Sequence, residues 1–329
     1  MSETQPMRSE GEGPAVEPIH PQPPTPVAEK PPRRLSNTAV RAMTAAVLIP
    51  FVLWTIAQGG YLYLAVITGI ILLGLREFYQ MIEAKGADPL EGYGLLAGAS
   101  LPVVAWFGSE YHATVLMTAV LLGVMVAQLR KAEISEAMAS ISGTFFGVFY
   151  VGWLLSHAVV LRNFHAMVES RWGFAAAASV DPEAGAYLMV FCLTAVVGSD
   201  AGAYFAGSAY GRRKLAPNIS PSKTVEGALG GVVFGTFCAL VCKALFDFQW
   251  PELSALFGYA FAAALAAILG VVGIVGDLVE SVLKRDAAQK DTGALLPGMG
   301  GVLDRIDSAL LAIPIMYYVM LAYTWLQVI

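Results

Sequence analysis

Nine apolar segments, each roughly 20 residues long, divide most of this chain and leave little room for a soluble domain. A helix needs about 20 apolar residues to cross a bilayer, and a β-barrel shows shorter alternating strands instead. Hydrophobic residues make up 57% of the 329 residues, above the range of about 45–50% for soluble domains. The sequence therefore predicts an all-α polytopic integral membrane protein with about nine transmembrane helices, at 39–57, 60–79, 92–108, 112–128, 137–161, 185–207, 225–246, 254–276 and 308–328.

The first 36 residues differ from the rest in composition. They hold nine of the chain's 18 prolines and almost no large apolar side chains. Such a segment cannot bury enough surface to order itself, so 1–36 is predicted to be a disordered, Pro-rich tail. It lacks the short apolar core of a cleaved signal peptide.

The distribution of Lys and Arg predicts the orientation of the helices. With the tail in the cytoplasm and nine crossings, 17 of the 20 basic residues fall in cytoplasmic segments. Only Arg162, Arg171 and Lys243 fall on the other side. Cytoplasmic loops of membrane proteins carry such an excess, so a cytoplasmic N-terminus is predicted.

Ten charged residues lie in the short stretch 276–308, between two apolar segments. Asp277, Glu280 and Lys284 share one face if the preceding helix continues past Gly276. Carboxylates at helix ends suit a hard divalent cation such as Mg²⁺, which binds one or two of them together with substrate phosphates. Asp277, Asp304 and Asp307 are therefore predicted metal ligands, and a solvated loop explains them poorly because acids do not help orientation.

Glycines and bases in the same stretch suit a phosphate ligand. Gly300 and Gly301 let backbone approach a ligand and present N–H groups to it. The bases neutralise phosphate oxygens, with arginine doing so in bidentate fashion. The predicted phosphate contacts here are Lys284, Arg285, Lys290, Arg305, Gly300 and Gly301. A purely solvated loop remains the alternative for Arg285, Asp286 and Lys290.

A second polar stretch, 198–227, is predicted on the same side of the membrane. Asp200 lies inside an apolar helix, where an acid is a functional candidate. The sequence SPSKTVEG follows, and Ser220, Ser222, Lys223 and Thr224 are predicted phosphate donors. It is not a Walker A loop. The spacing of Gly198 and Gly202, and of three glycines from Gly227 to Gly235, predicts close helix packing.

The three cysteines and four histidines form no ligand or catalytic spacing. The predicted site lies at the membrane interface and has no histidine base, cysteine nucleophile or zinc set. Its substrate would have a phosphate head and a lipid tail, and no nucleic-acid partner is expected.

The stretch SVLKRDAAQKDTGALLPGMGGVLDRIDS resembles the signature of the phosphatidate cytidylyltransferases, the CDP-diacylglycerol synthases. The chain from Ser199 to Gly227 is also similar to a segment of that family, and the resemblance is dense over the last 145 or so residues. Met299 stands where the family usually has His, and Ala201 where Thr is common. The signature is matched at Ser281, Lys284, Arg285, Lys290, Asp291, Gly293, Leu296, Pro297, Gly300, Gly301, Asp304, Arg305 and Asp307.

The resemblance implies transfer of CMP from CTP to phosphatidate in phospholipid biosynthesis, giving CDP-diacylglycerol and pyrophosphate. It implies a membrane domain at 37–329 with a catalytic part at about 185–308, Mg²⁺ with Mn²⁺ as the alternative ion, and a homodimer. The site would face the cytoplasm from the cell inner membrane. Asp277, Lys284, Asp304 and Asp307 would be catalytic, and Asp200, Glu280, Ser281 and Asp291 would line the pocket.

Three other hypotheses remain at this stage. A relative could cytidylylate another lipid phosphate, because only the lipid-facing wall would differ. An ion-coupled transporter would need a mid-membrane site, interrupted helices and internal repeats, which the sequence does not show. The Met299 substitution suggests the third, a catalytically dead homologue.

Overall fold

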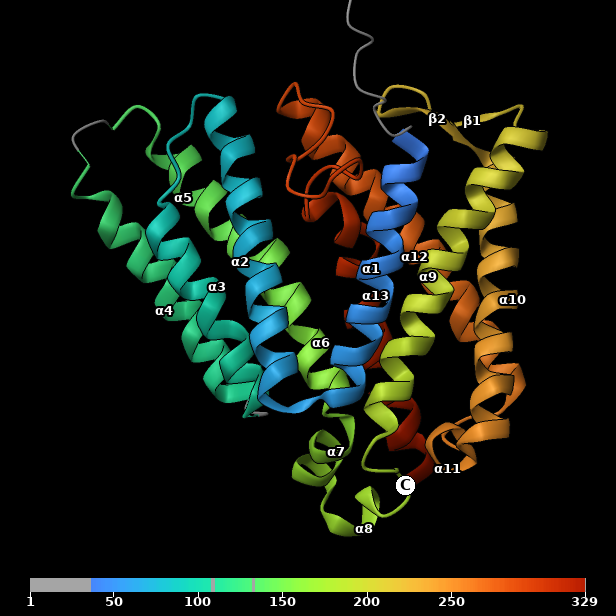
Figure 1. Cartoon of the computed structure of the whole chain (residues 1–329). Coiled ribbons are helices and arrows are strands. Elements are labelled where there is room, and N and C mark those ends of the chain that lie inside the picture. Colours follow the sequence, from blue (N-terminus) through green and yellow to red (C-terminus); the bar gives the residue numbers. More distant parts are fainter. Residues whose placement is uncertain (1–36, 108–109, 132–133, 329) are drawn as a thin grey trace, which may run out of the picture. The chain divides into compact units, whose positions relative to one another are not determined.

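The computed structural model describes residues 37–107, 110–131 and 134–328, which fold as a bundle of long antiparallel helices (Figure 1). The predicted tail, 1–36, lies outside the described residues. Eight of the described helical segments are long and apolar enough to cross a membrane. They confirm the prediction of an all-α polytopic membrane protein.

The helical segments follow the predicted apolar runs closely. The ninth expected span, 92–108, is a 16-residue helix that is shorter than the other eight but runs between its neighbours across the same bundle. The long elements are α1 (Asn37–Gln58), α2 (Gly60–Ala84), α3 (Glu91–Trp106), α4 (Glu110–Gln128), the continuous segment α5 (Ala137–Gly147), η1 (Val148–Trp153) and α6 (Leu154–Arg162), then α9 (Ala184–Tyr210), α10 (Val225–Gln249), α12 (Tyr259–Asp286) and α13 (Leu303–Val328).

The buried core joins α2, η1, α6, α9, α12 and α13, through side chains such as Leu75, Val151, Leu188, Leu269 and Leu310. Glycines bring α9 and α10 together, as predicted. A Cβ atom at Gly198 would lie 3.1 Å from the Cα of Gly235, and one at Gly202 would lie 3.1 Å from the Cα of Gly231. Larger residues would push these helices apart, which explains the spacing of the glycines.

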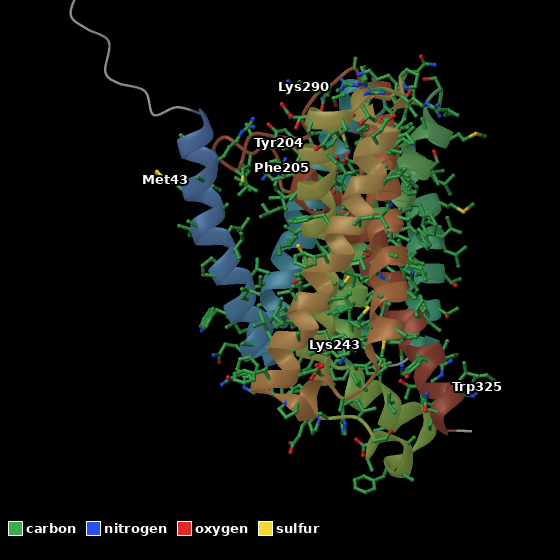
Figure 2. All side chains as sticks on the ribbon, turned by 90° about the vertical axis from the view of Figure 1, so that its right-hand side faces the viewer. Met43, Tyr204, Phe205, Lys243, Lys290 and Trp325 are labelled. Atoms are coloured by element: carbon green, nitrogen blue, oxygen red, sulfur yellow. The ribbon has the colours of Figure 1, made fainter. Side chains whose placement is uncertain are left out.

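The segments rich in Lys and Arg gather at one end of the bundle. In Figure 1 the start of α1, the end of α2, the β-strands and the loop between α12 and α13 all lie at the upper end. Figure 2 places Lys290 at this end and Lys243 toward the opposite one. The asymmetry that the sequence predicted is therefore a property of the folded bundle.

A small hairpin stands between α9 and α10, where the sequence predicted only a loop. Strands β1 (Lys214–Ala216) and β2 (Ser220–Thr224) pair antiparallel. Thr224 begins α10 by accepting a hydrogen bond from the N–H of Gly227, at 3.1 Å. The Glu226 carboxylate accepts from the backbone N–H groups of Arg212 and Arg213, at 3.0 and 3.1 Å. These bonds fix the entry to α10.

Three short helices close the opposite end of the bundle: α7 (Phe164–Trp172), α8 (Phe174–Ala177) and α11 (Pro251–Ser254). They occupy segments that connect membrane helices. Each is too short to show a helical pattern of apolar residues in the sequence.

Candidate active site

Three carboxylates meet where α12 and α13 lie side by side. Asp277 and Glu280 come from α12, which continues ten residues past the predicted end at Gly276, and Asp307 comes from the first turns of α13. One ligand oxygen from each lies within 4.8 Å of the others. Gly276 allows this approach, because a Cβ atom there would lie 2.7 Å from the Asp307 carbonyl oxygen.

Two lysines hold the carboxylates from different directions. Lys223, on β2, forms an ion pair with Asp277 at 2.5 Å. Lys284, one turn beyond Glu280 on α12, contacts Glu280 at 2.6 Å and Asp304 at 2.8 Å. Arg285 donates to the Ile219 carbonyl at 3.3 Å. The two polar stretches therefore meet, which their predicted position on one side of the membrane allows.

Asp304 lies beside this carboxylate cluster and is bonded differently from its predicted partners. Its Oδ2 accepts from the backbone N–H groups of Gly301 and Thr292, at 2.8 and 3.0 Å, while its Oδ1 accepts from Lys284. Asp304 is in the first turn of α13, where backbone N–H groups lack acceptors within the helix and can donate to a carboxylate instead. Glu280, predicted only to line the pocket, takes the third place in the cluster, and a metal-ligand role for Asp304 stays a prediction.

The remaining acidic and hydroxyl candidates surround the cluster. Asp200, on α9, is exposed and within electrostatic reach of Asp277 and Asp307. Ser281 donates to Asp277 at a long 3.5 Å. On β2, the hydroxyls of Ser220 and Ser222 lie 3.5 Å from each other.

The predicted phosphate contacts fall into two groups in the structure. Lys290 and Arg305 are exposed, as is the neighbouring Asp291. Two others already have intramolecular partners: the Thr224 hydroxyl accepts from Gly227, and the Gly301 N–H donates to Asp304. Gly300 has a φ of 90°, a conformation that favours glycine, and its carbonyl accepts from the Leu296 N–H. Their phosphate roles stay predictions.

Sequence reasoning missed two residues that border the site. Glu77, on α2, is 7% exposed and bonds to the loop before α13. Tyr150, on the π-helix η1, has a buried hydroxyl for which the described residues supply no hydrogen bond, and it lies within electrostatic reach of the carboxylate cluster. π-helical turns often occur at functional sites. Glu77 could have been selected as a candidate because it is an acid at the end of an apolar segment. No feature of the sequence distinguishes Tyr150 from the other tyrosines.

The donor set fits a hard divalent cation. All three cluster groups are carboxylates, and their ion pairs involve two lysines, one of which is shared with Asp304. The three carboxylates of the cluster therefore outnumber the two lysines that pair with them. Glu280 is completely buried, and its Oε1 has no hydrogen-bond partner among the described residues. A buried carboxylate oxygen without a partner is costly unless a ligand satisfies it.

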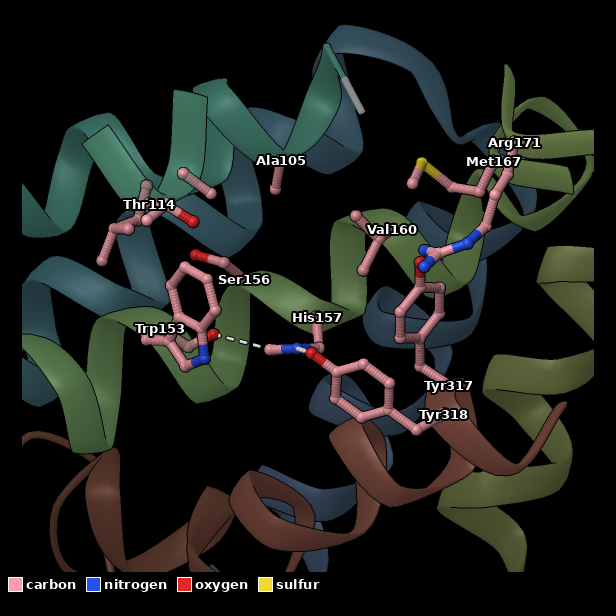
Figure 3. Close-up of a pocket in the computed structure, with 12 residues that line it drawn as sticks. Ala105, Thr114, Trp153, Ser156, His157, Val160, Met167, Arg171, Tyr317 and Tyr318 are labelled. Atoms are coloured by element: carbon pink, nitrogen blue, oxygen red, sulfur yellow. Dashed lines mark hydrogen bonds between the residues drawn. The ribbon is translucent and has the colours of Figure 1, made fainter. Parts of the chain in front are cut away.

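A cavity of about 420 Å³ lies away from this cluster (Figure 3). Residues of α3, α4, η1, α6, α7 and α13 line it. His157 hydrogen-bonds there to the Trp153 carbonyl and the Tyr318 hydroxyl, at 2.9 and 3.1 Å. The cavity borders the middle of α13, at Tyr317 and Tyr318, whereas Asp304 and Asp307 occupy the first turns of this helix. It includes none of the predicted site residues.

Comparison with known proteins identifies the class of the chain. A family model described as the cytidylyltransferase family matches residues 39–323. A phosphatidate cytidylyltransferase from Synechocystis sp. is 33% identical over 289 residues, which cover 84% of this chain and 94% of that protein. A phosphatidate cytidylyltransferase from Brucella suis is 31% identical over 283 residues, covering 86% and 93% of the two chains.

A third relative matches a shorter part of the chain. The phosphatidate cytidylyltransferase of Bacillus subtilis is 36% identical over 175 residues, which cover 53% of this chain and 60% of that protein. The fold and these matches together define a membrane-embedded nucleotidyltransferase. The chain belongs to the cytidylyltransferase family.

Proposed function

We propose that this protein transfers CMP from CTP to phosphatidate and releases CDP-diacylglycerol and pyrophosphate. The single observation that carries the proposal is the carboxylate cluster of Asp277, Glu280 and Asp307 with its two lysines, at the end of a membrane bundle. A reaction between a soluble nucleotide and a membrane lipid must take place at such an end. The names of the relatives add the substrates.

The proposed chemistry needs no histidine base. An oxygen of the phosphatidate phosphate monoester, already an anion at neutral pH, attacks the α-phosphorus of CTP. A new P–O–P bond forms to the lipid phosphate, and the bond between the α- and β-phosphates breaks to release pyrophosphate. The chain's part is to hold the two anionic reactants in line and to offset their charge. Methionine at position 299 is therefore compatible with activity.

Magnesium is the proposed cofactor, with Mn²⁺ as the alternative, and Asp277, Glu280 and Asp307 are the residues that would hold it. When bound, the ion would supply positive charge to the nucleotide phosphates and the departing pyrophosphate. Lys223 and Lys284 would contribute ammonium groups that are already placed beside the carboxylates. Lys290 and Arg305, both exposed, are proposed to bind the outer phosphates.

The proposed location is the cell inner membrane, with the carboxylate cluster facing the cytoplasm. The excess of Lys and Arg at this end of the bundle supports that orientation. CTP is a cytosolic nucleotide, so the proposed reaction requires that the carboxylate cluster face the cytoplasm. A homodimer stays a prediction from the family resemblance.

The test is a labelled-lipid assay on purified protein in detergent. The protein is mixed with α-³²P-labelled CTP, phosphatidate and Mg²⁺, and lipid-soluble label is measured. We expect labelled lipid only when phosphatidate and the metal are both present, and γ-labelled CTP should give none. No labelled lipid from folded protein with any member of a panel of lipid phosphates would contradict nucleotidyl transfer. Label with another lipid phosphate alone would correct the acceptor.

A further inference from the structure

Glu77 connects α2 to the loop before α13 through hydrogen bonds that span more than 200 residues of sequence. Its Oε1 accepts from the Val302 N–H at 2.9 Å. Its Oε2 accepts from the Leu303 N–H at 2.8 Å and from the Thr292 hydroxyl at 3.1 Å. Both oxygens of this buried carboxylate therefore accept hydrogen bonds from the polar stretch 276–308.

The bonds from Glu77 fix the beginning of α13. The first amide N–H groups of a helix lack partners within the helix, and an anion placed there is stabilised by the helix dipole. Glu77 supplies the anion to Val302 and Leu303, while Asp304 accepts from Gly301 just before them. Two carboxylates, one from α2 and one from α13, therefore hold consecutive amides of the same turn.

A continuous set of hydrogen bonds leads from Glu77 to the carboxylate cluster. Thr292 bonds to Glu77 through its hydroxyl and to Asp304 through its N–H. Asp304 accepts from Lys284, and Lys284 also donates to Glu280, one of the three cluster carboxylates. A displacement of Glu77 would therefore move the start of α13 and, with it, Asp304. Lys284 donates to both Asp304 and Glu280, so its position beside the carboxylate cluster would change as well.

Two glycines of the signature stretch fit closely against Glu77. A Cβ atom at Gly293 would lie 2.7 Å from Glu77 Oε1, and one at Gly301 would lie 2.5 Å from Glu77 Oε2. The neighbouring groups are a buried carboxylate and its bonded loop, so they cannot move away freely. Close approach to Glu77 is thus a physical reason for glycine at both positions, separate from any contact with phosphate.

We propose that Glu77 is a positioning residue for nucleotidyl transfer, which places the start of α13 and the Asp304–Lys284 pair against the carboxylate cluster. The proposal rests on the function proposed above. Glu77 acts through its partners and does not itself reach the cluster. Catalysis is sensitive to such placement, because a displacement of about 1 Å can lower a rate by roughly 100-fold.

Glu77→Gln is the most informative change because it keeps the shape and removes only an acceptor and the charge. In either amide orientation its NH₂ group would face a backbone N–H, that of Val302 or that of Leu303. We expect kcat per folded molecule to fall between about 10-fold and 100-fold, and the Mg²⁺ activation constant to rise. Glu83→Gln, an exposed glutamate on the same helix, is the matched control and should leave both values unchanged.

A purely structural role predicts a different pattern. Glu77→Gln would then lower the folded fraction, while kcat per folded molecule and the Mg²⁺ activation constant would stay within twofold of those of the unaltered protein; that result would overturn the proposal. Glu77→Asp keeps the charge but shortens the reach, so we expect it to recover part of the loss. The Asp variant also serves if the Gln variant fails to fold.

Coupling along the bonds gives a second measurement. Thr292→Val removes the hydroxyl donor to Glu77, so its effect on kcat should be smaller in the Glu77→Gln background than alone. Fully additive effects would contradict a connected set of bonds.

Hydrogen exchange separates this proposal from the proposed function. The amides of Thr292 and Gly301–Leu303 should exchange faster in Glu77→Gln, and those of α7 should not change. If the unaltered protein makes no labelled lipid, the proposed function fails, and unchanged exchange at these amides would independently exclude the role of Glu77.

Discussion

The buried bases at one end of the bundle and the carboxylate cluster at the other differ in how completely their charges are matched by partners. At the end with α7, α8 and α11, each buried base is matched by acceptors. Arg162 donates to the Ile56 carbonyl at 2.7 Å and to Glu183 at 2.6 Å. Lys243 pairs with Asp247 at 3.0 Å, donates to the Ser254 carbonyl at 3.1 Å and lies over two aromatic rings. Charge here fastens helices together.

The other end carries acids in excess of their partners. Asp277, Glu280 and Asp307 lie within 4.8 Å of one another, and one buried oxygen of Glu280 has no hydrogen-bond partner among the described residues. A matched charge stabilises a fold, whereas an unmatched one is a cost that a ligand can remove. The comparison teaches that burial of charge does not by itself mark a site; the balance of charges and partners does.

The largest expected effect is at the unmatched end. Asp307→Asn keeps the shape of the side chain but removes a charge from the carboxylate cluster. Turnover should fall on the order of 1,000-fold, because offsetting phosphate charge is worth several kcal/mol. The labelled-lipid assay measures the loss, and circular dichroism and thermal melting in detergent check that the variant is folded. Activity equal to that of the unaltered protein would remove Asp307 from the site.

At the matched end, Arg162→Met should affect stability and leave the chemistry unchanged. It removes hydrogen bonds from a charged group to the end of α1 and to Glu183, each a contribution that mutational series place at about 2 kcal/mol when one partner is charged. We expect a lower midpoint in thermal unfolding, with kcat per folded molecule within twofold of the original. Arg130→Gln, an exposed change, is the control. A large loss of kcat without a loss of stability would break the distinction between the two ends.

The smallest expected effect concerns Met299, which lies in the signature loop and is partly exposed. The two residues before Met299 hold this loop against α1: Arg41 donates to the Gly298 carbonyl at 2.8 Å, and Thr44 donates to the Pro297 carbonyl at 3.1 Å. Met299→His should change kcat by less than about threefold, as expected for a change outside the core. A loss of more than tenfold would mean that methionine is required in this loop.

Sequence alone was sufficient for the membrane architecture, and it indicated that the two polar stretches could meet. Apolar runs predict spans because every backbone polar group in a bilayer must be paired within its own helix, which makes the signal local. Asp277 and Glu280 could be placed together for the same reason, since residues three apart share a helix face. The close packing of α9 against α10 could also be predicted from the spacing of their glycines.

Only the tertiary structure decided which acids gather and which serve other bonds. Spacing treated Asp304 and Asp307 alike, yet the first accepts from loop amides and Lys284 while the second joins the cluster. Glu77 reaches the same loop from α2, more than 200 residues earlier, and the Tyr150 hydroxyl on η1 lies within electrostatic reach of the cluster. Such partnerships depend on how distant helices pack and which donors they leave unpaired, and no local pattern in the sequence encodes that.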